Sequence, residues 1–407
     1  MKLWYLLLAC CGLGACKPPP ELDNRPEIEV YQLFGLTEGL EPVDMLLPRA
    51  GSELVILNNA DPRGATRPTL VGTELNGTGR WTQELPVPDE NFRYVAEDLY
   101  EGGAAGLYVC GTALRALDNA GTVETYPFLF HTDYAGRLIW SRLYVGLSGR
   151  DLGRAVTGAV DGEGLAVTGS RRTGEVSDFL LLQTDAEGNL VQVTVQGTDQ
   201  ENQYGTDLAV EAGEYWVFGS TFLSAPAAFG LRLQKLSPDG TPLGGPAVPA
   251  EGQAIAARLL RLPDGYLWVG NVYPDLPPDL GWPPVPVPDS AVRYFLVEVG
   301  LDLNLRWTQT GAPGIRARDA VGHPEGGFSL LCDTLSGNGE SGLYVVELTA
   351  TGEVISGRGY GYNGNETGGR ILAPTPGTLL ISGATEAAGL RKTMYLRLRR
   401  EVAAADE

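Results

Sequence analysis

The amino-acid sequence predicts an all-β chain folded as a seven-bladed β-propeller, and three observations support this prediction. An apolar, strand-like segment that ends in a small residue recurs along the chain, and so does a strand that runs into a tight turn. Both segments recur with a period of about fifty residues, which is typical of propeller repeats. No long stretch with the 3.6-residue period of a helix interrupts them.

The two recurring segments give independent registers of the same repeat. The first segment ends at Asn58, Gly111, Gly169, Gly219, Gly270, Cys332 and Gly383. The turns that follow the second segment are centred on Gly77, Gly136, Gly188, Gly240, Asn304 and Gly352. Gly and Asn suit these turns because a tight hairpin requires a positive φ, which other residues adopt at a cost.

Each repeat contains four short strand signals separated by turn residues. In the third repeat they cover residues 154–160, 165–169, 178–184 and 190–194. Four antiparallel strands in each repeated unit are the pattern of a propeller blade.

The two ends of the repeat region set the number of blades. The strand Tyr395–Arg399 has no partner after it, and the strand Ile28–Phe34 precedes the first unit. Pairing these strands would complete a seventh blade and close the ring, which would leave no sheet edge exposed. The predicted propeller therefore covers residues 27–402, with a tail at 403–407. A six- or eight-bladed ring and a pair of β-sandwiches are the alternatives.

The first residues have the features of an export signal. Lys2 is followed by an apolar run from Leu3 to Ala15 that is too short to span a membrane. We therefore expect a signal peptide over 1–15. The end of this run, Leu13-Gly14-Ala15-Cys16, resembles the bacterial lipobox, and this resemblance implies a lipid anchor on Cys16. An ordinary cleaved signal peptide is the alternative.

The segment after Cys16 predicts how the body is attached. Residues 16–26 contain three consecutive prolines and read as an extended tether. Lys17 stands where an Asp would retain a lipoprotein in the inner membrane, so we expect the outer membrane, with the protein facing either the periplasm or the cell surface.

Composition excludes some classes of partner and bounds the cysteine chemistry. The 407 residues include 30 Lys+Arg and 50 Asp+Glu, which gives a net charge of −20, and 43% of residues are hydrophobic. An acidic surface argues against nucleic acid as a partner. Cys110 and Cys332 lie in apolar strands of separate repeats, so we expect two buried free thiols.

The repeat resembles loosely related propeller units that are common in exported Bacteroidetes proteins. These units have the form apolar–Gly followed by Thr/Ser-Asp-x-x-Gly-x-x-x-Trp, as in Thr132-Asp133-Tyr134-Ala135-Gly136 with Trp140. The chain lacks the sequence boxes of Trp-Asp repeats, kelch repeats and sialidases. The resemblance therefore implies a fold and a cell-envelope location, and no activity.

No catalytic group, metal site or cofactor is predicted. The chain has only two histidines, His131 and His323, each just before a turn of a different repeat, and we expect both to be plain turn residues. A Ser-His-Asp site or a zinc site needs more than this. Most acidic pairs fall in hairpin turns, where Asp bonds its own backbone.

The best candidate for ligand contact is the loop face opposite the hairpin turns. The loop 272–290 contains seven prolines and would hold Tyr273 and Trp282 in place. Neighbouring connections add the other candidate contact residues, which are Arg316, Arg318, Tyr360, Tyr362 and Asn363. Aromatic, Arg and amide side chains suit a sugar or a protein hot spot. Alternatively, Trp282 simply covers the apolar end of the fifth blade.

These observations lead to one functional prediction and two alternatives. We expect a monomeric, lipid-anchored propeller that acts as a non-enzymatic binding scaffold for a protein partner or a glycan at the envelope. The first alternative is a carbohydrate-active enzyme, a glycoside hydrolase or lyase, with two acids and an Arg converging at the channel mouth. The second is an accessory lipoprotein with a fixed partner in an outer-membrane machine.

Overall fold

The structure is a computed structural model that confirms the all-β prediction. It describes residues 27–400 except 35–38, 50–52, 61–65, 103–105, 118–122, 148, 198–200, 225–226, 275–290, 336–340, 361–364 and 388–389. The regular secondary structure of these described residues consists of 29 β-strands and no helix. No helix within them is long and apolar enough to cross a membrane.

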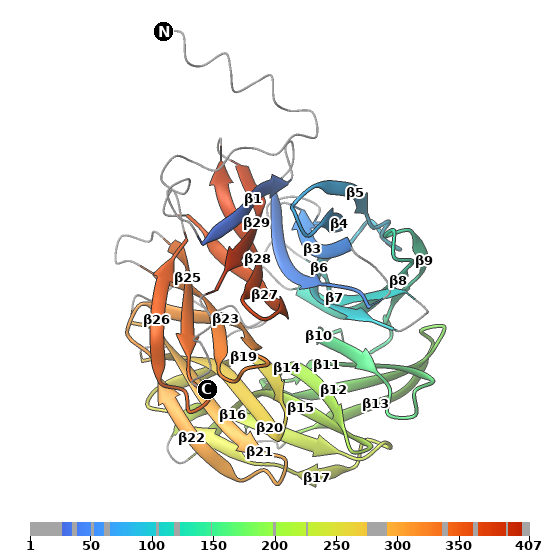
Figure 1. Ribbon diagram of the computed structural model, residues 1–407. Coiled ribbons are helices and arrows are strands. Elements are labelled where there is room, and N and C mark those ends of the chain that lie inside the picture. Colours follow the sequence, from blue (N-terminus) through green and yellow to red (C-terminus); the bar gives the residue numbers. More distant parts are fainter. Residues whose placement is uncertain are drawn as a thin grey trace.

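Three sheets have four antiparallel strands each, arranged in chain order (Figure 1). The first contains β2 (Leu40–Leu46), β3 (Glu53–Ala60), β4 (Pro68–Glu74) and β5 (Gly79–Glu84). The second contains β6 (Arg93–Glu101), β7 (Leu107–Ala116), β8 (Val123–Thr132) and β9 (Leu138–Leu143). The third contains β10 (Asp151–Gly158), β11 (Gly164–Thr173), β12 (Val176–Asp185) and β13 (Leu190–Gln196).

The next two sheets are variations on the same arrangement. In one, β14 (Gln203–Glu211), β15 (Glu214–Ser224) and β16 (Ala227–Leu236) are followed by two short strands that both pair with β16, β17 (Pro242–Gly244) and β18 (Ala247–Pro249). The other has eight strands, β19 (Gln253–Leu262), β20 (Gly265–Tyr273), β21 (Arg293–Gly300), β22 (Leu305–Thr310), β23 (Ile315–Gly322), β24 (Phe328–Leu335), β25 (Ser341–Leu348) and β26 (Val354–Gly359). Within the described residues, its two four-stranded halves share one parallel residue pair in the sheet ladder, Arg293 with Ile315.

The remaining sheet unites the two ends of the described chain. Its strand order is β1 (Ile28–Phe34), β29 (Leu390–Arg399), β28 (Thr378–Ala387) and β27 (Thr367–Thr375). The antiparallel register runs from Val30 opposite Arg397 to Phe34 opposite Thr393. The predicted pairing of 28–34 with 395–399 is confirmed, and Figure 1 shows the blue strand β1 beside the red strand β29.

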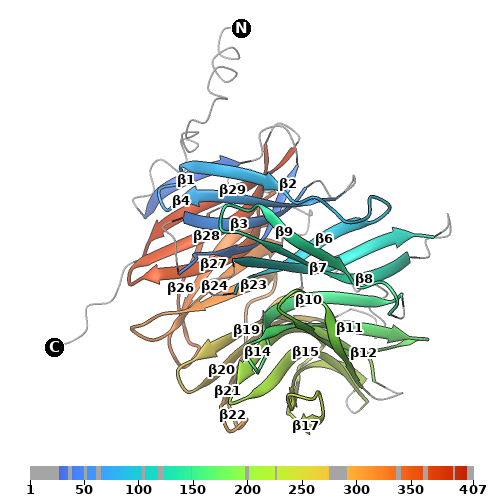
Figure 2. The ribbon, with the colours of Figure 1, turned by 90° about the vertical axis from the view of Figure 1, so that its right-hand side faces the viewer.

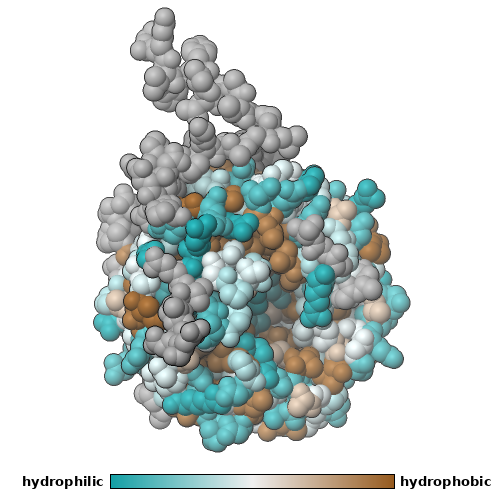
Figure 3. All heavy atoms as spheres, in the orientation of Figure 1, coloured by the Kyte–Doolittle hydropathy of each residue, from teal (hydrophilic) through white to brown (hydrophobic). Residues whose placement is uncertain are grey.

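One strand of each sheet, and one strand of each half of the eight-stranded sheet, faces a common centre. These strands are β2, β6, β10, β14, β19, β23 and β27; each contacts the next, and β27 contacts β2. Figures 1 and 2 show the sheets arranged around this centre, and Figure 3 shows a surface hollowed near its middle. We call these seven the inner strands.

Each inner strand carries a one-residue β-bulge at the same place. The register shifts fall at Val43, Glu97, Arg154, Thr206, Ala257, Arg318 and Gly369. A bulge turns an additional side chain out of the ladder. Here it turns one residue from every inner strand toward the centre.

Hydrogen bonds from one sheet to the next follow the predicted repeat. After six of the seven anchors of the first register, a polar residue accepts a backbone N–H bond from the next inner strand. The acceptors are Asn59, Thr112, Ser170, Ser220, Asn271 and Asp333, with bond lengths of 2.7–3.1 Å. The donors are Ala96, Gly153, Gly205, Ala256, Ala317 and Gly368, each directly before a bulge.

The glycines of the hairpin turns have two structural roles. Gly136 and Gly188 have φ values of 76° and 75°, a conformation that favours glycine. A Cβ at either position would also come within 2.6 Å of the tryptophan on the preceding sheet, Trp81 or Trp140. The positive φ is confirmed at the five predicted glycines. The prediction for Asn304 is wrong, because Leu303 adopts the positive φ of 62° in that turn.

Apolar side chains pack between neighbouring sheets, and the two thiols lie among them. Cys110 and Cys332 are fully buried and unpaired, as predicted. Burial raises the pKa of both thiols well above the ordinary value, because the thiolate would lose its hydration.

Candidate functional site

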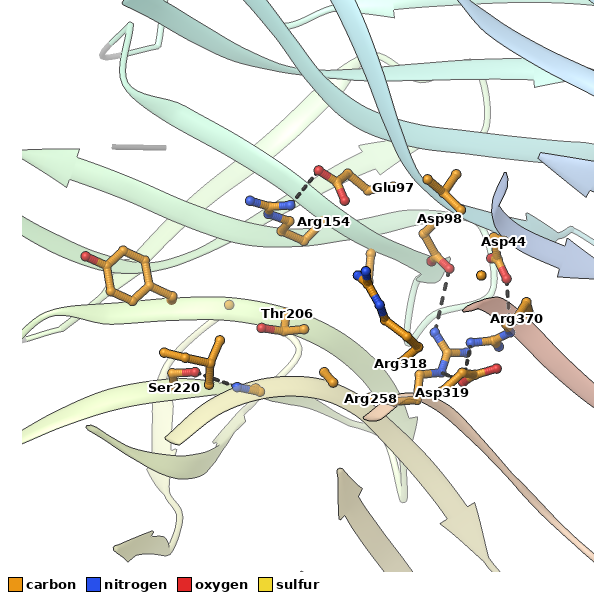
Figure 4. A pocket seen from close by; sticks show the side chains of 18 of the residues that line it. Asp44, Glu97, Asp98, Arg154, Thr206, Ser220, Arg258, Arg318, Asp319 and Arg370 are labelled. Atoms are coloured by element: carbon orange, nitrogen blue, oxygen red, sulfur yellow. Dashed lines mark hydrogen bonds and ion pairs between the residues drawn. The ribbon is translucent and has the colours of Figure 1, made fainter. Parts of the chain in front are cut away.

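The inner strands surround a cavity of about 220 Å³. All seven bulge residues line it, together with the residue after several of the bulges (Figure 4). Its lining also contains Ser170, Tyr204, Ser220 and Ile255. These residues lie between the bulges and the loop face opposite the hairpin turns. The candidate site is therefore built by the repeat itself.

The residue after the bulge is Asp in four inner strands. These residues are Asp44, Asp98, Asp207 and Asp319, all buried. One carboxylate oxygen of each accepts a 2.8 Å bond from a backbone N–H of the next inner strand, on Leu99, Val156, Leu259 and Ile371 respectively. This row of aspartates, which we call the Asp row, links each sheet to its neighbour.

Two arginines occupy the same position in other inner strands. Arg258 Nε lies 3.4 Å from Asp207 and 3.7 Å from Asp319, and its Nη1 lies 3.9 Å from Asp98. Arg370 makes ion pairs of 3.0 Å with both Asp44 and Asp319. Both guanidinium groups are therefore occupied by the Asp row.

Two carboxyls of the Asp row have raised pKa values. Burial is the main cause for Asp98, and the negative charge of Asp44 adds to it while Arg258 opposes it. Burial also raises the pKa of Asp319, although Arg370 and Arg258 stabilise its ionised form. These carboxyls hold protons more tightly than a solvated Asp does.

Charged bulge residues face the rest of the cavity. Arg154 Nη1 bonds Glu97 Oε1 at 2.5 Å, and both side chains are about one quarter exposed, at 26% and 23%. Arg318 uses its Nε to bond Asp333 at 2.5 Å, and 33% of its side chain is exposed.

The structure brings together three of the predicted contact residues. Arg316 and Arg318 both bond Asp333 Oδ2, and their positive charges act on the Tyr273 hydroxyl. Tyr273 is 1% exposed, and burial raises its pKa. Only Arg318 of these three lines the cavity.

The other predicted contact residues are placed differently. Tyr360 is buried and packs in the apolar cluster that includes Leu343 and Ile371, so it does not line the cavity. Trp282, Tyr362, Asn363 and the predicted lipidation site Cys16 lie outside the described residues.

The two histidines are more than plain turn residues, which corrects that expectation. His131 belongs to β8, is buried, and stacks on Tyr108 with the ring centroids 4.4 Å apart. His323 does begin a turn, but its Nε2 lies 2.7 Å from Ser329 Oγ, which donates to Glu347. Ser329 has no exposed surface, so this group is a buried network and no nucleophile is accessible in it. Within the described residues no cluster of three metal-ligating side chains occurs.

Sequence reasoning missed the Asp row, although a signal for it existed. Each of its members precedes an apolar or small residue, as in Asp44-Met45 and Asp98-Leu99, and they stand one or two repeats apart. The sequence analysis places most acidic pairs in hairpin turns and assigns no role to these four, because the bulge that points them inward has no signature in a single sequence.

Comparisons with known proteins assign the chain to no family. No family model and no curated protein matches the chain. Similar solved structures include a Bacteroides caccae protein of unknown function, with 13% identity and a TM-score of 0.42 over 72% of this chain and 90% of that one. The β-propeller domain of the Trilobed protease from Pyrococcus furiosus has 10% identity and a TM-score of 0.44, over 88% of this chain and 93% of that one.

A variant of the Synechocystis apocarotenoid oxygenase is also similar, with 12% identity and a TM-score of 0.44 over 90% of this chain and 95% of that one.

Proposed function

We propose that this chain is a lipid-anchored, seven-bladed β-propeller of the bacterial outer membrane that binds a protein partner or a glycan without catalysing a reaction. Seven inner strands with equivalent bulges, contact between β27 and β2, and the pairing of β1 with β29 support a closed ring of seven blades. Closure of this kind removes sheet edges that would otherwise pair with other chains.

The observation that carries a binding role is the use of the acids in the cavity. Asp44, Asp98, Asp207 and Asp319 each accept a backbone N–H bond from the neighbouring inner strand. A general acid or base must be free to exchange a proton with substrate. The repetition of one bond in four sheets favours a structural role for these carboxylates.

The position of the N-terminal strand supports a membrane-distal cavity. The N–H of Arg399 bonds the carbonyl of Glu27, and Ile28 pairs with Leu398, so β1 begins at the end of the molecule where β29 finishes. That end carries the hairpin turns, and the cavity extends from the Asp row toward the opposite end. A lipid on Cys16 would then hold the turn face toward the membrane and present the cavity face outward.

Partner capture tests the proposed function. Outer membranes would be crosslinked in three strains. One expresses the full chain, one a chain that lacks residues 275–290, and one the Cys16→Ser variant. We expect the full chain to label with a fatty-acid analogue and to retain a partner or glycan that the loop deletion loses. Absence of label on Cys16, or an identical partner set without the loop, would contradict the respective part of the proposal.

The enzyme alternative has one observation in its favour. Asp44 and Asp98 line the same cavity, and the charge of Asp44 contributes to the raised pKa of Asp98. Glycoside hydrolases use two carboxyls, one of them protonated. Release of reducing ends from envelope polysaccharides by the full chain, abolished by Asp98→Asn, would favour the enzyme over the scaffold.

A further inference from the structure

The four arginines that line the cavity fall into two classes. Arg258 and Arg370 lie among the aspartates of the Asp row, each facing at least two of them. Their charge is balanced by this row. Arg154 and Arg318 are bulge residues, and each has only one carboxylate partner among the described residues.

Arg154 and Arg318 keep N–H groups for a ligand. Arg318 bonds Asp333 through its Nε, and neither of its terminal nitrogens has a partner within the described part of the chain. Arg154 bonds Glu97 through one terminal nitrogen only. Figure 4 shows the Arg318 side chain extending into the cavity on the side where Glu97 and Arg154 lie.

A hydroxyl group lines the cavity together with these guanidinium groups. Ser170 and Ser220 belong to the lining, but both are only 1% exposed, and each accepts a backbone N–H bond, from Gly205 and Ala256. Thr206 is half-buried and adds its hydroxyl to the lining. The wall therefore offers charged donors for an anion and a neutral group for a hydroxyl.

We infer that the cavity binds the carboxylate of an acidic sugar, a single uronic acid unit at the end of a glycan. This inference rests on the proposed binding function and names its ligand. A guanidinium edge with two N–H groups matches a carboxylate and binds it more strongly than a neutral group. Glu97 and Thr206, which also line the cavity, would bond the ring hydroxyls of the sugar.

Cavity size and overall charge favour one acidic sugar over a longer anion. The volume of about 220 Å³ is below the 300–1,000 Å³ of pockets that hold drug-sized ligands. The chain has a net charge of −20, which repels a polyanion as a whole. A glycan with one terminal carboxylate avoids that repulsion.

Titration calorimetry on the purified full chain in detergent tests this inference. The probes are D-glucuronate, D-glucose, D-glucuronamide and a short peptide that ends in glutamate. We expect glucuronate to bind, and glucose and glucuronamide to bind at least about tenfold more weakly, because both lack the anion. Equal binding of glucose and glucuronate, binding of none of the probes, or preference for the peptide would overturn the acidic-sugar assignment.

Matched variants separate the cavity from general effects of charge. Arg318→Gln should weaken glucuronate binding at least about tenfold, whereas Arg80→Gln, which removes the same charge on β5, should leave it unchanged. An Arg318→Gln variant that binds glucuronate as well as the unaltered chain would overturn the inference. Partner capture by residues 275–290 tests the proposed function separately, so the two can fail independently.

Discussion

Two junctions between neighbouring sheets have different chemistry at equivalent positions. Where the β14–β18 sheet meets β19, Ser220 and Asp207 accept backbone N–H bonds of 2.8 Å from Ala256 and Leu259. We call this an ordinary junction. Most junctions between neighbouring sheets contain the equivalent of one or both of these bonds.

The junction between β27–β29 and β2, which we call the closing junction, lacks both bonds. The residue after the anchor Gly383 is Ala384, which has no acceptor, and the residue before the bulge at Val43 is Pro42, which has no N–H. Arg370 occupies the position after the bulge, where an Asp would be needed as the acceptor. The N–H that would donate to it, that of Met45, bonds Asp44 in its own strand instead.

Other contacts replace them at the closing junction. Arg370 pairs with Asp44 at 3.0 Å, and the Thr393 hydroxyl donates to Asn58 at 2.5 Å. The Tyr395 hydroxyl donates to the Leu75 carbonyl at 2.9 Å. The comparison teaches that the repeat fixes the ordinary junctions, whereas the proposed closure of the ring rests on β29 and on its pairing with β1.

The largest expected effect comes from removing β1. A chain that lacks residues 1–35 exposes the edge of β29 and uncovers apolar residues such as Met394 and Leu396. We expect it to lose cooperative unfolding or to aggregate, a loss of more than about 4 kcal/mol. A chain that lacks only residues 1–26 is the control, and thermal unfolding with size-exclusion chromatography is the measurement. Equal stability of the two chains would show that β1 is dispensable for closure.

Asp319→Ala should have the next largest effect, because this carboxylate holds an ordinary junction and two arginines of the centre. It accepts the Ile371 N–H and pairs with Arg370 and Arg258. Its removal leaves the buried Ile371 N–H without its acceptor and takes one of the carboxylates that balance two half-buried arginines, which should cost about 3 kcal/mol. Urea unfolding measures the change, with Asp239→Ala in an exposed turn as the control. A loss no greater than that of the control would argue against the Asp row as a structural element.

A pair of reciprocal variants sharpens the comparison between the junctions. Ser220→Ala leaves the buried Ala256 N–H without its acceptor and should cost about 1–3 kcal/mol. Ala384→Ser places a buried hydroxyl at the equivalent site, where Pro42 offers no N–H donor. This variant should not gain stability, and it should lose up to about as much as Ser220→Ala does. Urea unfolding of both variants is the check, and a gain of stability from Ala384→Ser would contradict our account of the closing junction.

The smallest expected effect is a pH dependence from Asp98. Its pKa is raised in the folded state, so the folded chain binds this proton more tightly than the unfolded chain does. The resulting stability is complete below the unfolded pKa and is lost as pH rises through the folded pKa. In the Asp98→Asn variant the amide stays neutral at every pH and can still accept the Val156 N–H. The stability of this variant relative to the unaltered chain should therefore increase as pH rises above about 4. Chemical unfolding at several pH values measures this, and a difference independent of pH would contradict it.

The repeat and its ends could be predicted from sequence because both rest on local signals. The turn glycines at 77, 136, 188, 240 and 352, the strand Ile28–Phe34 and the two buried thiols follow from residue type and alternation. The exception arises because this turn has the same backbone bonds as the others, but Leu303 occupies the position that glycine has in them, and the residue type that suits a positive φ, Asn304, follows it.

The cavity could not be predicted in the same way, because side-chain direction at a bulge depends on pairing between strands. Arg318 was expected on a loop and lies at the bulge of β23 instead. Tyr273 and Tyr360 carry apolar rings at strand ends, and packing between sheets buries both. These two aromatic residues therefore do not mark the cavity that the bulges build.

Closure is tested most directly by a crosslink between the two terminal strands. Val30 lies opposite Arg397, so V30C with R397C should form an intrachain disulfide on mild oxidation, read as a mobility shift in denaturing gels that reductant reverses. The control V30C with K392C uses the same strands out of register and should stay reduced. A disulfide in the matched pair alone is the predicted result, and crosslinks between chains, or none in the matched pair, would contradict the closed ring.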